Sequence, residues 1–445
     1  MTDGPPPPVD RRTLLPPRPR AAPTRATTGT TRAAGPSPAP PRVSPVFIVL
    51  YTLAFLSTSL LFLAPLLVTL ALKVNSLVGP QAAPNSLSLV AGVGGLLSIV
   101  ANPFFGRMSD RTSWRWGRRR PWMVIGLLAG SSGIAVIALA PSIAVVLVGW
   151  CIAQVFFNAL LAAEVAVLPD QVPEAQRGMV AGVLGICTPV ASVTGTFLVK
   201  LFTGNLLVMF LAPCAIGGSF VLLFAMVLHD RPLDPADKPP WSLREFAATF
   251  YVDPRKSPDF AWAFVSRFLL VLAYAFLVTY QAYYLLNKLG SAESDVPQQI
   301  FLGALVQSVL VVVASLVGGR LSDWTGRRKV FVLVASIVYG FALFVLAAAT
   351  DVNGFLVGMA ISGLGFGVYF AVDLALVTQV LPDHDNAAKD LGVFNIAGAL
   401  PFTIAPALAP AVLAAGGGSY AVLYTVAGLC AVAGAFAILP VRGVR

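Results

Sequence analysis

From residue 45 onward, long apolar stretches alternate with short polar segments. Each stretch reaches or slightly exceeds the roughly 20 residues that an α-helix needs to cross a hydrocarbon core about 30 Å thick. Strands of a membrane β-barrel would be about ten residues long and would alternate in polarity, and these stretches do not. The pattern therefore predicts an all-α membrane protein with twelve transmembrane helices, at 46–73, 87–106, 121–140, 142–168, 178–203, 205–228, 259–287, 297–318, 330–349, 353–381, 390–415 and 418–440.

The composition supports a membrane protein. Of the 445 residues, 57% are hydrophobic and 11% are charged, whereas a soluble domain carries about 25% charged residues. So few charges cannot cover the surface of a soluble protein of this size. The cysteines fall inside apolar stretches, where free cysteine behaves as a small hydrophobic residue, so no disulfide framework is indicated. They are Cys151, Cys187, Cys214 and Cys430.

Residues 1–44 contain 12 prolines and 7 arginines but no apolar run. A secretory signal would need a hydrophobic core of about 7–15 residues, which this segment lacks. A proline-rich segment buries too little surface to fold, so we predict a disordered tail. The tail is either solvated without a partner or bound through its arginines to an anionic membrane leaflet.

The basic residues predict the orientation. With the N-terminus in the cytoplasm, 26 of the 30 lysines and arginines fall on the cytoplasmic side, and only Lys73 and Lys288 remain in loops on the other side. Such asymmetry follows the positive-inside rule. It predicts a multi-pass protein of the cell membrane (inner or plasma membrane) with both termini cytoplasmic. It also accounts for the net charge of +10, so no nucleic-acid partner is expected.

The chain contains an internal repeat. Residues 106–110 (GRMSD) and 319–323 (GRLSD) are 213 residues apart, and the Leu-Pro-Asp segments at 168–170 and 381–383 share that offset. We therefore expect two pseudo-symmetric six-helix bundles. Parallel repeats of this kind place a substrate site near the membrane midplane, between the bundles. The expected domains are the cytoplasmic tail 1–44, bundles at 45–228 and 259–440, a cytoplasmic linker at 229–258 and a cytoplasmic C-terminal tail at 441–445.

The two repeated loops, with their Gly-Arg-Arg clusters at 117–120 and 326–329, resemble the signature of the major facilitator superfamily. Within it, the longer first loop at 109–121 and the segment 389–401 resemble sucrose/proton symporters and glycoside–cation symporters. The chain departs from their pattern at Phe402, where glutamine is usual, and its fourth span lacks the arginine of plant sucrose carriers. The resemblance implies proton-coupled symport of a sugar or glycoside by alternating access.

The repeated loops are candidate gates. Asp110 and Asp323 stand at helix ends beside several arginines. A carboxylate there can pair with a guanidinium and cap a helix N-terminus, and such contacts can break and re-form as two bundles rock. The resemblance implies that these loops lock the outward-facing state; alternatively they only fix the topology. The candidate gate residues are Gly106, Asp110, Arg111, Arg118, Gly319, Asp323 and Arg327.

Three charged residues lie inside predicted spans: Glu164, Arg267 and Asp373. A charge at a helix centre costs on the order of 2.5–3.5 kcal/mol on insertion scales, so it usually faces a cavity or a partner. By resemblance, the fourth, seventh and tenth helices that carry them line the central path. We hypothesise that Asp373 is a protonatable coupling residue and Arg267 its charge partner; the alternative is a static pair that fixes helix packing. Glu164, close to a cytoplasmic helix end, is expected to be partly hydrated.

Sugar recognition needs hydrogen-bonding groups and aromatic faces. The spans that would line the path offer both, although such side chains also form ordinary interhelical hydrogen bonds. The candidate substrate-binding residues are Tyr51, Gln154, Asn158, Tyr274, Gln281, Phe366, Tyr369 and Asn395.

Three other functions compete with sugar symport. One is proton-coupled export of drug-like or natural-product molecules on the same fold, and another is a membrane sensor or scaffold without transport. An enzyme is disfavoured, because no nucleophile–base pair or metal-ligand set occurs in or beside the spans. No Walker loop is present, so direct drive by ATP is unsupported. We expect no cofactor, no bound metal and a monomeric protein whose partners are a small-molecule substrate, protons and the lipid bilayer.

Overall fold

The computed structural model describes residues 43–230, 232–233, 255, 257–380 and 387–442, and these are almost entirely helical. Residues 1–42 of the predicted tail, most of the predicted linker 229–258 and the last three residues lie outside the described residues. The prediction of an all-α fold is confirmed.

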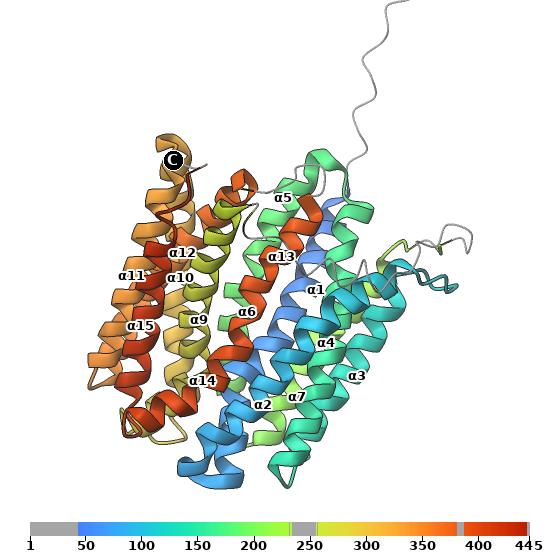
Figure 1. Ribbon diagram of the computed structural model, residues 1–445. Helices are drawn as coiled ribbons and strands as arrows, with labels where there is room; N and C mark the ends of the chain where they lie inside the picture. The colour runs from blue at the N-terminus through green and yellow to red at the C-terminus, as the bar shows by residue number, and fades with distance from the viewer. Residues whose placement is uncertain (1–42, 231, 234–254, 256, 381–386, 443–445) are drawn as a thin grey trace, which may run out of the picture. The chain divides into compact units, whose positions relative to one another are not determined.

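The first half of the chain forms one set of helices (Figure 1). It begins with a helix that contains one π-helical stretch, at Pro65–Thr69 (η2). The α-helices are α1 (Pro45–Ala64), α2 (Leu70–Asp110), α3 (Arg120–Leu139), α4 (Ile143–Gln171), α5 (Glu174–Gly185), α6 (Cys187–Leu201) and α7 (Leu206–Val227).

The second half repeats this arrangement beside the first (Figure 1). Its helices are α9 (Pro258–Asn287), α10 (Val296–Thr325), α11 (Arg328–Ala348), α12 (Val352–Val380), α13 (Ala387–Ala399), α14 (Pro401–Ala415) and α15 (Tyr420–Ala437).

Two of the predicted spans consist of two helices each. The span predicted at 178–203 breaks at Ile186 between α5 and α6, and the span at 390–415 breaks at Leu400 between α13 and α14. The first segments end at Gly185 and Ala399, 214 residues apart, within one residue of the sequence repeat. The break is thus a feature of the repeated fold, because it recurs at the equivalent place in both halves.

The loop expected between the first two spans is mostly helical. α1, η2 and α2 follow one another from Pro45 to Asp110, and the chain turns at Gly79, which has φ 72° and ψ 168°. A side chain would clash with the backbone in that conformation, so glycine suits it. The prediction of a loop over 74–86 is wrong because the turn uses one residue and helices continue on both sides.

Within each half, small residues allow neighbouring helices to pack closely. In the first half, α4 packs against α2 and α3, and α1 packs against α6 and α7. Gly133 and Gly149 let α3 and α4 approach closely, since a Cβ on Gly133 would lie 2.6 Å from the Gly149 carbonyl oxygen. Small residues at such crossings are typical of membrane helices. Between the halves, α2 contacts α14 and α6 contacts α10.

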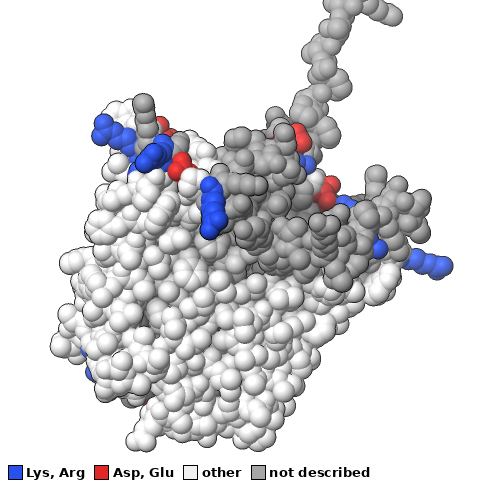
Figure 2. Space-filling view, in the orientation of Figure 1, with Lys and Arg blue, Asp and Glu red and all other residues white. Residues whose placement is uncertain are grey.

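The molecular surface separates charged from apolar regions. Figure 2 shows lysine, arginine, aspartate and glutamate gathered mainly at one end, while the visible sides carry almost no charge. This end holds the loops at 107–120 and 320–329, and we call it the arginine-rich end. Among the described residues, 11 helical segments are long and apolar enough to cross a membrane, and the first of them contains both α1 and α2. The chain is therefore a multi-pass membrane protein.

Candidate functional site

An ion pair lies among the membrane-spanning helices of the second half. The Arg267 Nη1 atom in α9 lies 2.6 Å from the Asp373 Oδ2 atom in α12. The Tyr369 hydroxyl donates to the other carboxylate oxygen of Asp373 at 2.8 Å. The Arg267 side chain is 21% exposed and that of Asp373 is 12% exposed. The charges expected to be partners are therefore in direct contact and only partly shielded from the surroundings.

The guanidinium of Arg267 has a further neighbour in the broken helix. Its Cζ atom lies 4.8 Å from the centre of the Phe394 ring in α13, a cation–π distance. Gly398 in the same helix also lies close, because a Cβ there would be 3.3 Å from Arg267 Nη2. Arg267 thus connects α9 both to α12, through Asp373, and to α13, through Phe394. A change at this pair would affect three helices.

Aromatic rings form a second cluster on α9, α12 and α14. Tyr274 stacks on Phe366 with 4.6 Å between the ring centres, and Phe402 meets Tyr274 edge-on at 6.1 Å. Tyr339 of α11 lies 5.9 Å from Phe366. Phe402 is the residue that departs from the symporter pattern, and the structure shows that it extends an aromatic wall. Tyr274 and Phe366, predicted separately, are brought together.

Amide side chains form a third cluster, between α4 and α2. The Asn158 amide nitrogen donates to the Ser98 hydroxyl at 3.1 Å and to the backbone oxygen of Gln154 at 2.8 Å. Asn102 donates to the Asn158 side-chain oxygen at 3.4 Å. Asn158 is buried while Gln154 is half-buried. The cluster joins the two predicted amides to α2, whose Ser98 and Asn102 were not among the predicted residues.

Tyr51 and Glu164 lie apart from these clusters. Tyr51 stacks on Phe224 of α7 with 5.2 Å between ring centres, and its hydroxyl donates to the backbone oxygen of Glu164 at 2.8 Å. Glu164 is 0% exposed rather than partly hydrated, because α1 covers this part of α4. Among the described residues, neither of its carboxyl oxygens has a hydrogen-bond partner. The structure thus places Tyr51 in helix packing and buries the Glu164 side chain.

The two remaining predicted residues differ in accessibility. Gln281 lies in α9 and is 2% exposed. Asn395 follows Phe394 in α13 and is exposed. Asn395 is therefore the more exposed of these two candidates.

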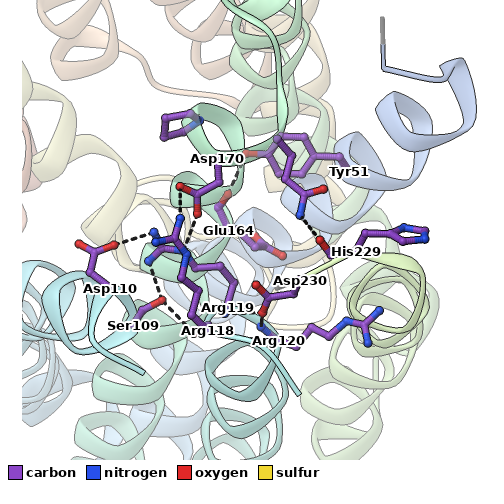
Figure 3. A network of polar contacts seen from close by, with 12 residues as sticks. Tyr51, Ser109, Asp110, Arg118, Arg119, Arg120, Glu164, Asp170, His229 and Asp230 are labelled. Carbon is purple, nitrogen blue, oxygen red and sulfur yellow. Dashed lines mark hydrogen bonds and ion pairs between the residues drawn. The ribbon is translucent and has the colours of Figure 1, made fainter. Parts of the chain in front are cut away.

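A network of charged residues joins four segments at the arginine-rich end (Figure 3). Arg119 lies at its centre, with Asp110 at 2.6 Å and Asp170 at 2.8 Å. Arg118 also pairs with Asp170, at 2.7 Å. Burial opposes the charge on the Arg119 guanidinium, but the two carboxylates outweigh it and raise its pKa above the ordinary value. The α2–α3 loop is thereby fixed to the end of α4.

Asp230, just after α7, completes this network (Figure 3). Its Oδ2 atom accepts hydrogen bonds from the backbone nitrogens of Arg119 at 2.6 Å and Arg120 at 2.9 Å. It satisfies amide groups at the start of α3, as an N-cap residue does. The Arg120 side chain donates in turn to the Met226 carbonyl at the end of α7, at 2.9 Å.

The second half repeats part of this network. Asp323 lies 3.5 Å from Arg328, the counterpart of the Asp110–Arg119 pair. Lys329 donates to the carbonyls of Leu439 and Val441 beyond α15, as Arg120 does at α7. Leu439 stands 213 residues after Met226, so these contacts follow the sequence repeat. Asp383, the repeat partner of Asp170, lies outside the described residues.

The predicted gate residues are distributed unequally over this network. Asp110 and Arg118 belong to it, and Asp323 belongs to its counterpart. Arg111 lines a neighbouring pocket, and Arg327 is exposed. At Gly106 and Gly319, no atom in the described part of the chain would lie within 3.4 Å of an added Cβ.

Sequence reasoning missed Arg119, Asp170 and Asp230 as members of this site. The repeated Leu-Pro-Asp segment was a usable signal for Asp170. Nothing in the sequence alone distinguished Arg119 from Arg118 and Arg120, because the three arginines are consecutive. Asp230 belongs to none of the sequence motifs described above.

Comparison with known proteins identifies the family. The Major Facilitator Superfamily profile matches residues 46–313 and 295–444. Two Arabidopsis thaliana proteins are similar over short segments. "Plastidic glucose transporter 4" is 34% identical over 114 residues, which are 25% of this chain and 20% of the relative. "Putative polyol transporter 2" is 33% identical over 89 residues, which are 20% of this chain and 17% of the relative. The chain thus matches only about a fifth of these relatives' length.

Solved structures share the fold. The nucleoside transporter NupG superposes with a TM-score of 0.70 at 13% identity, over 89% of this chain and 99% of the other. The human organic anion transporter MFSD10 superposes with a TM-score of 0.62 at 15% identity, over 88% and 98%. At these identities the likeness concerns the fold alone. With two pseudo-symmetric helical bundles and a family profile matched along nearly its whole described length, the chain belongs to the Major Facilitator Superfamily of membrane transporters.

Proposed function

We propose that this transporter carries out proton-coupled symport of a sugar or glycoside by alternating access, in the cell membrane, with its arginine-rich end in the cytoplasm. The observation that carries the proposal is the Arg267–Asp373 ion pair, with Tyr369 hydrogen-bonded to the same carboxylate. A charge among membrane-spanning helices is costly unless it is paired. Such a pair is sensitive to a single proton, since protonation of Asp373 removes the negative charge that attracts Arg267.

Protonation gives the pair two states. When Asp373 is ionised, it holds α12 to Arg267 of α9. When Asp373 takes up a proton, the electrostatic attraction is lost, and Arg267 keeps its contact with the Phe394 ring of α13. The restraint between α9 and α12 is therefore weakened while that between α9 and α13 remains. A proton bound from one side and released to the other would in this way be linked to a movement of helices.

Two nearby features suit a sugar. The stacked Tyr274 and Phe366 rings offer an aromatic face, and the amides of Gln154 and Asn158 offer donors and acceptors. Sugars present both an apolar ring face and polar hydroxyls, so they fit sites that combine these groups. The printed names of the plant relatives, a glucose and a polyol transporter, agree with this substrate class. Tyr369 and Asn395 are further candidates for contact with the substrate.

The Arg119 network is proposed as the gate at the arginine-rich end. Its contacts with Asp110 and Asp170 join α2, α3 and α4 through charge-assisted hydrogen bonds, which are directional and can be exchanged for others. Movement of α2 relative to α4 would require at least one of these pairs to open.

The Asp373→Asn variant tests the coupling. We expect purified protein in proteoliposomes to lose accumulation of labelled sugar driven by an imposed pH gradient, because asparagine cannot take up and release the proton. Sugar binding and downhill exchange should persist, since the amide retains similar size and hydrogen bonding. Glu293→Gln, the same chemical change in an exposed loop, should leave gradient-driven uptake unchanged.

Two results would contradict the coupling role. Gradient-driven accumulation by Asp373→Asn with accompanying proton influx would make the ion pair a static packing contact. Loss of sugar binding together with uptake would place Asp373 in recognition instead.

The aromatic wall extended by Phe402 favours one other candidate, export of drug-like aromatic molecules. Extrusion of such a molecule against its gradient, without sugar uptake by the same preparation, would support export over symport.

A further inference from the structure

A pocket of about 500 Å³ lies at the arginine-rich end, where α2 passes into the loop before α3. Phe104, Met108 and Trp122 give it an apolar floor, while Arg111, Ser113 and Trp114 supply polar or amphipathic groups. Among the described residues, the seven that line it include one cation and no carboxylate. The pocket shares none of these lining residues with the Arg267–Asp373 pair or with the Tyr274–Phe366 cluster.

The pocket is held open by a fixed loop. The Trp122 indole nitrogen donates to the Thr112 hydroxyl at 2.7 Å, and Thr112 donates to the Met108 carbonyl at 2.8 Å. The Trp114 and Trp122 rings lie nearly parallel, 6.3 Å apart. A backbone hydrogen bond from Gly117 to Trp114 closes the turn at 3.0 Å. Trp114 is nevertheless 52% exposed. Its amphipathic ring therefore lies at the edge of a cavity whose loop is held by hydrogen bonds.

The pocket opens on a face of α2 that other helices leave uncovered. Leu89, Leu96 and Val100 are each more than half exposed, and at 100° per residue they share one face with Phe104 and Arg111. Gly95 lies on another face, against Thr403 of α14, and Gly94 faces Trp150 of α4. The exposed stripe therefore lies on a face that α4 and α14 leave uncovered, and it leads along α2 to the pocket.

The repeat shows that the pocket is a special feature of the first half. Six residues separate Asp110 from Gly117, but only two separate Asp323 from Gly326. The four extra residues include part of the Thr112–Trp114 segment that lines the pocket. The two residues of the equivalent short loop are Trp324, which is 83% exposed, and Thr325.

We propose that this pocket binds an anionic phospholipid, with an acyl chain along the Leu96–Val100 stripe and the headgroup phosphate at Arg111. Tryptophan suits the boundary between headgroups and hydrocarbon, where its ring is apolar and its N–H is polar. Arginine recognises phosphate through several donors, and basic residues near a membrane surface favour anionic lipids. Arg107 and Arg115, four residues on either side of Arg111, add to the positive potential.

Tryptophan quenching by brominated lipid tests the proposal on the full chain in lipid nanodiscs. Phosphatidylglycerol brominated near the headgroup should quench Trp114 more strongly than equally brominated phosphatidylcholine. This difference should disappear in Trp114→Phe and persist in Trp324→Phe. Inorganic phosphate at millimolar concentration should not reduce it, because a free anion lacks the acyl chain that the stripe accommodates.

Two matched arginine variants separate a built site from general surface charge. Arg111→Gln should weaken the apparent affinity for phosphatidylglycerol about fivefold, whereas Arg115→Gln, the same change at an exposed neighbour outside the pocket, should weaken it less. Native mass spectrometry gives a second measure, through the number of phosphatidylglycerol molecules retained by each variant. Near-ultraviolet circular dichroism checks that each variant is folded.

Three outcomes would overturn the proposal. Equal quenching by the two lipids would mean that only ordinary boundary lipid surrounds the loop. Equal weakening by Arg111→Gln and Arg115→Gln would assign the preference to surface charge. Displacement by inorganic phosphate would indicate a soluble anion as the ligand.

Discussion

At the scale of single residues, two glycines of the arginine-rich motif have different roles. Gly117 has φ +100°, and a Cβ there would lie 2.2 Å from the Asp230 carboxyl group. Gly106 is helical, and no atom of the described residues would lie within 4 Å of a Cβ there. Gly106 was among the candidate gate residues and Gly117 was not, but of the two it is Gly117 that requires the absence of a side chain in this structure.

Alanine substitution should separate these two glycines. Gly117→Ala should lower the free energy of unfolding by about 2 kcal/mol, because an L-residue at positive φ is strained and its methyl group would displace Asp230. Gly106→Ala should keep or slightly raise the stability, since alanine is favoured over glycine in a helix. Thermal unfolding in detergent measures both. Equal melting temperatures for Gly117→Ala and the parent protein would contradict the role assigned to the turn.

Asp230 shows at the same scale why the network could not be predicted in full. Its carboxylate accepts from backbone amides 110 and 111 residues earlier in the chain. No spacing rule relates such distant positions, and the contact depends on where α7 ends relative to the start of α3. Asp110 and Arg118 were predictable because they belong to a repeated motif.

At the scale of elements, the two lysines on the far side of the predicted membrane have a structural explanation. Lys73 donates to the Ala138 carbonyl near the end of α3, at 3.0 Å. Lys288 donates to the Leu346 carbonyl at 3.2 Å, and to that of Ala347, near the end of α11. Helix C-termini carry unsatisfied carbonyls and partial negative charge, so a cation is favoured there. The same capping arrangement occurs in both halves of the fold.

Removal of these lysines should destabilise the fold without touching the transport site. Lys73→Met and Lys288→Met should each lower the free energy of unfolding by about 1 kcal/mol, because terminal carbonyls lose a charged donor. The double variant should show an additive loss, since the caps are on different helices. Chemical unfolding in detergent measures the loss, and arginine at either position should retain much of the stability. Unchanged stability in both single variants would show that water replaces the lysines without cost.

At the scale of the whole molecule, hydrogen bonds join the two halves at the end opposite the arginine-rich loops. The Tyr283 hydroxyl donates to the Ala71 carbonyl at 3.0 Å. Ser88 and Tyr280 both donate to the Pro406 carbonyl, at 2.5 and 3.3 Å. These contacts hold that end closed in this structure. The alternating-access cycle that we propose would break them.

The adjacent tyrosines of α9 provide a matched test of this closure. Tyr283→Phe should shift the equilibrium about fivefold towards opening, because it removes one hydrogen bond worth about 1 kcal/mol between the halves. Tyr284→Phe removes a 2.8 Å bond to Leu346 within one half and should not shift it. Spin labels at Ala82→Cys and Ser294→Cys, in a background without native cysteines, would report the distance distribution. An equal shift in both variants would contradict the assignment of Tyr283 to the closure.

By itself, the sequence determined the all-α membrane class, most helix positions, the repeat and the presence of three charges within spans. These properties follow from local composition, since a run of about 20 apolar residues is the length that a helix needs to cross the membrane. The tertiary structure decided which partners meet. Arg267 reaches Asp373 across 106 residues, while Glu164 is left without a hydrogen-bond partner among the described residues. Each residue turns a helix by about 100°, so small differences in rotation and depth decide whether a buried charge meets a partner, and only the packed helices fix them.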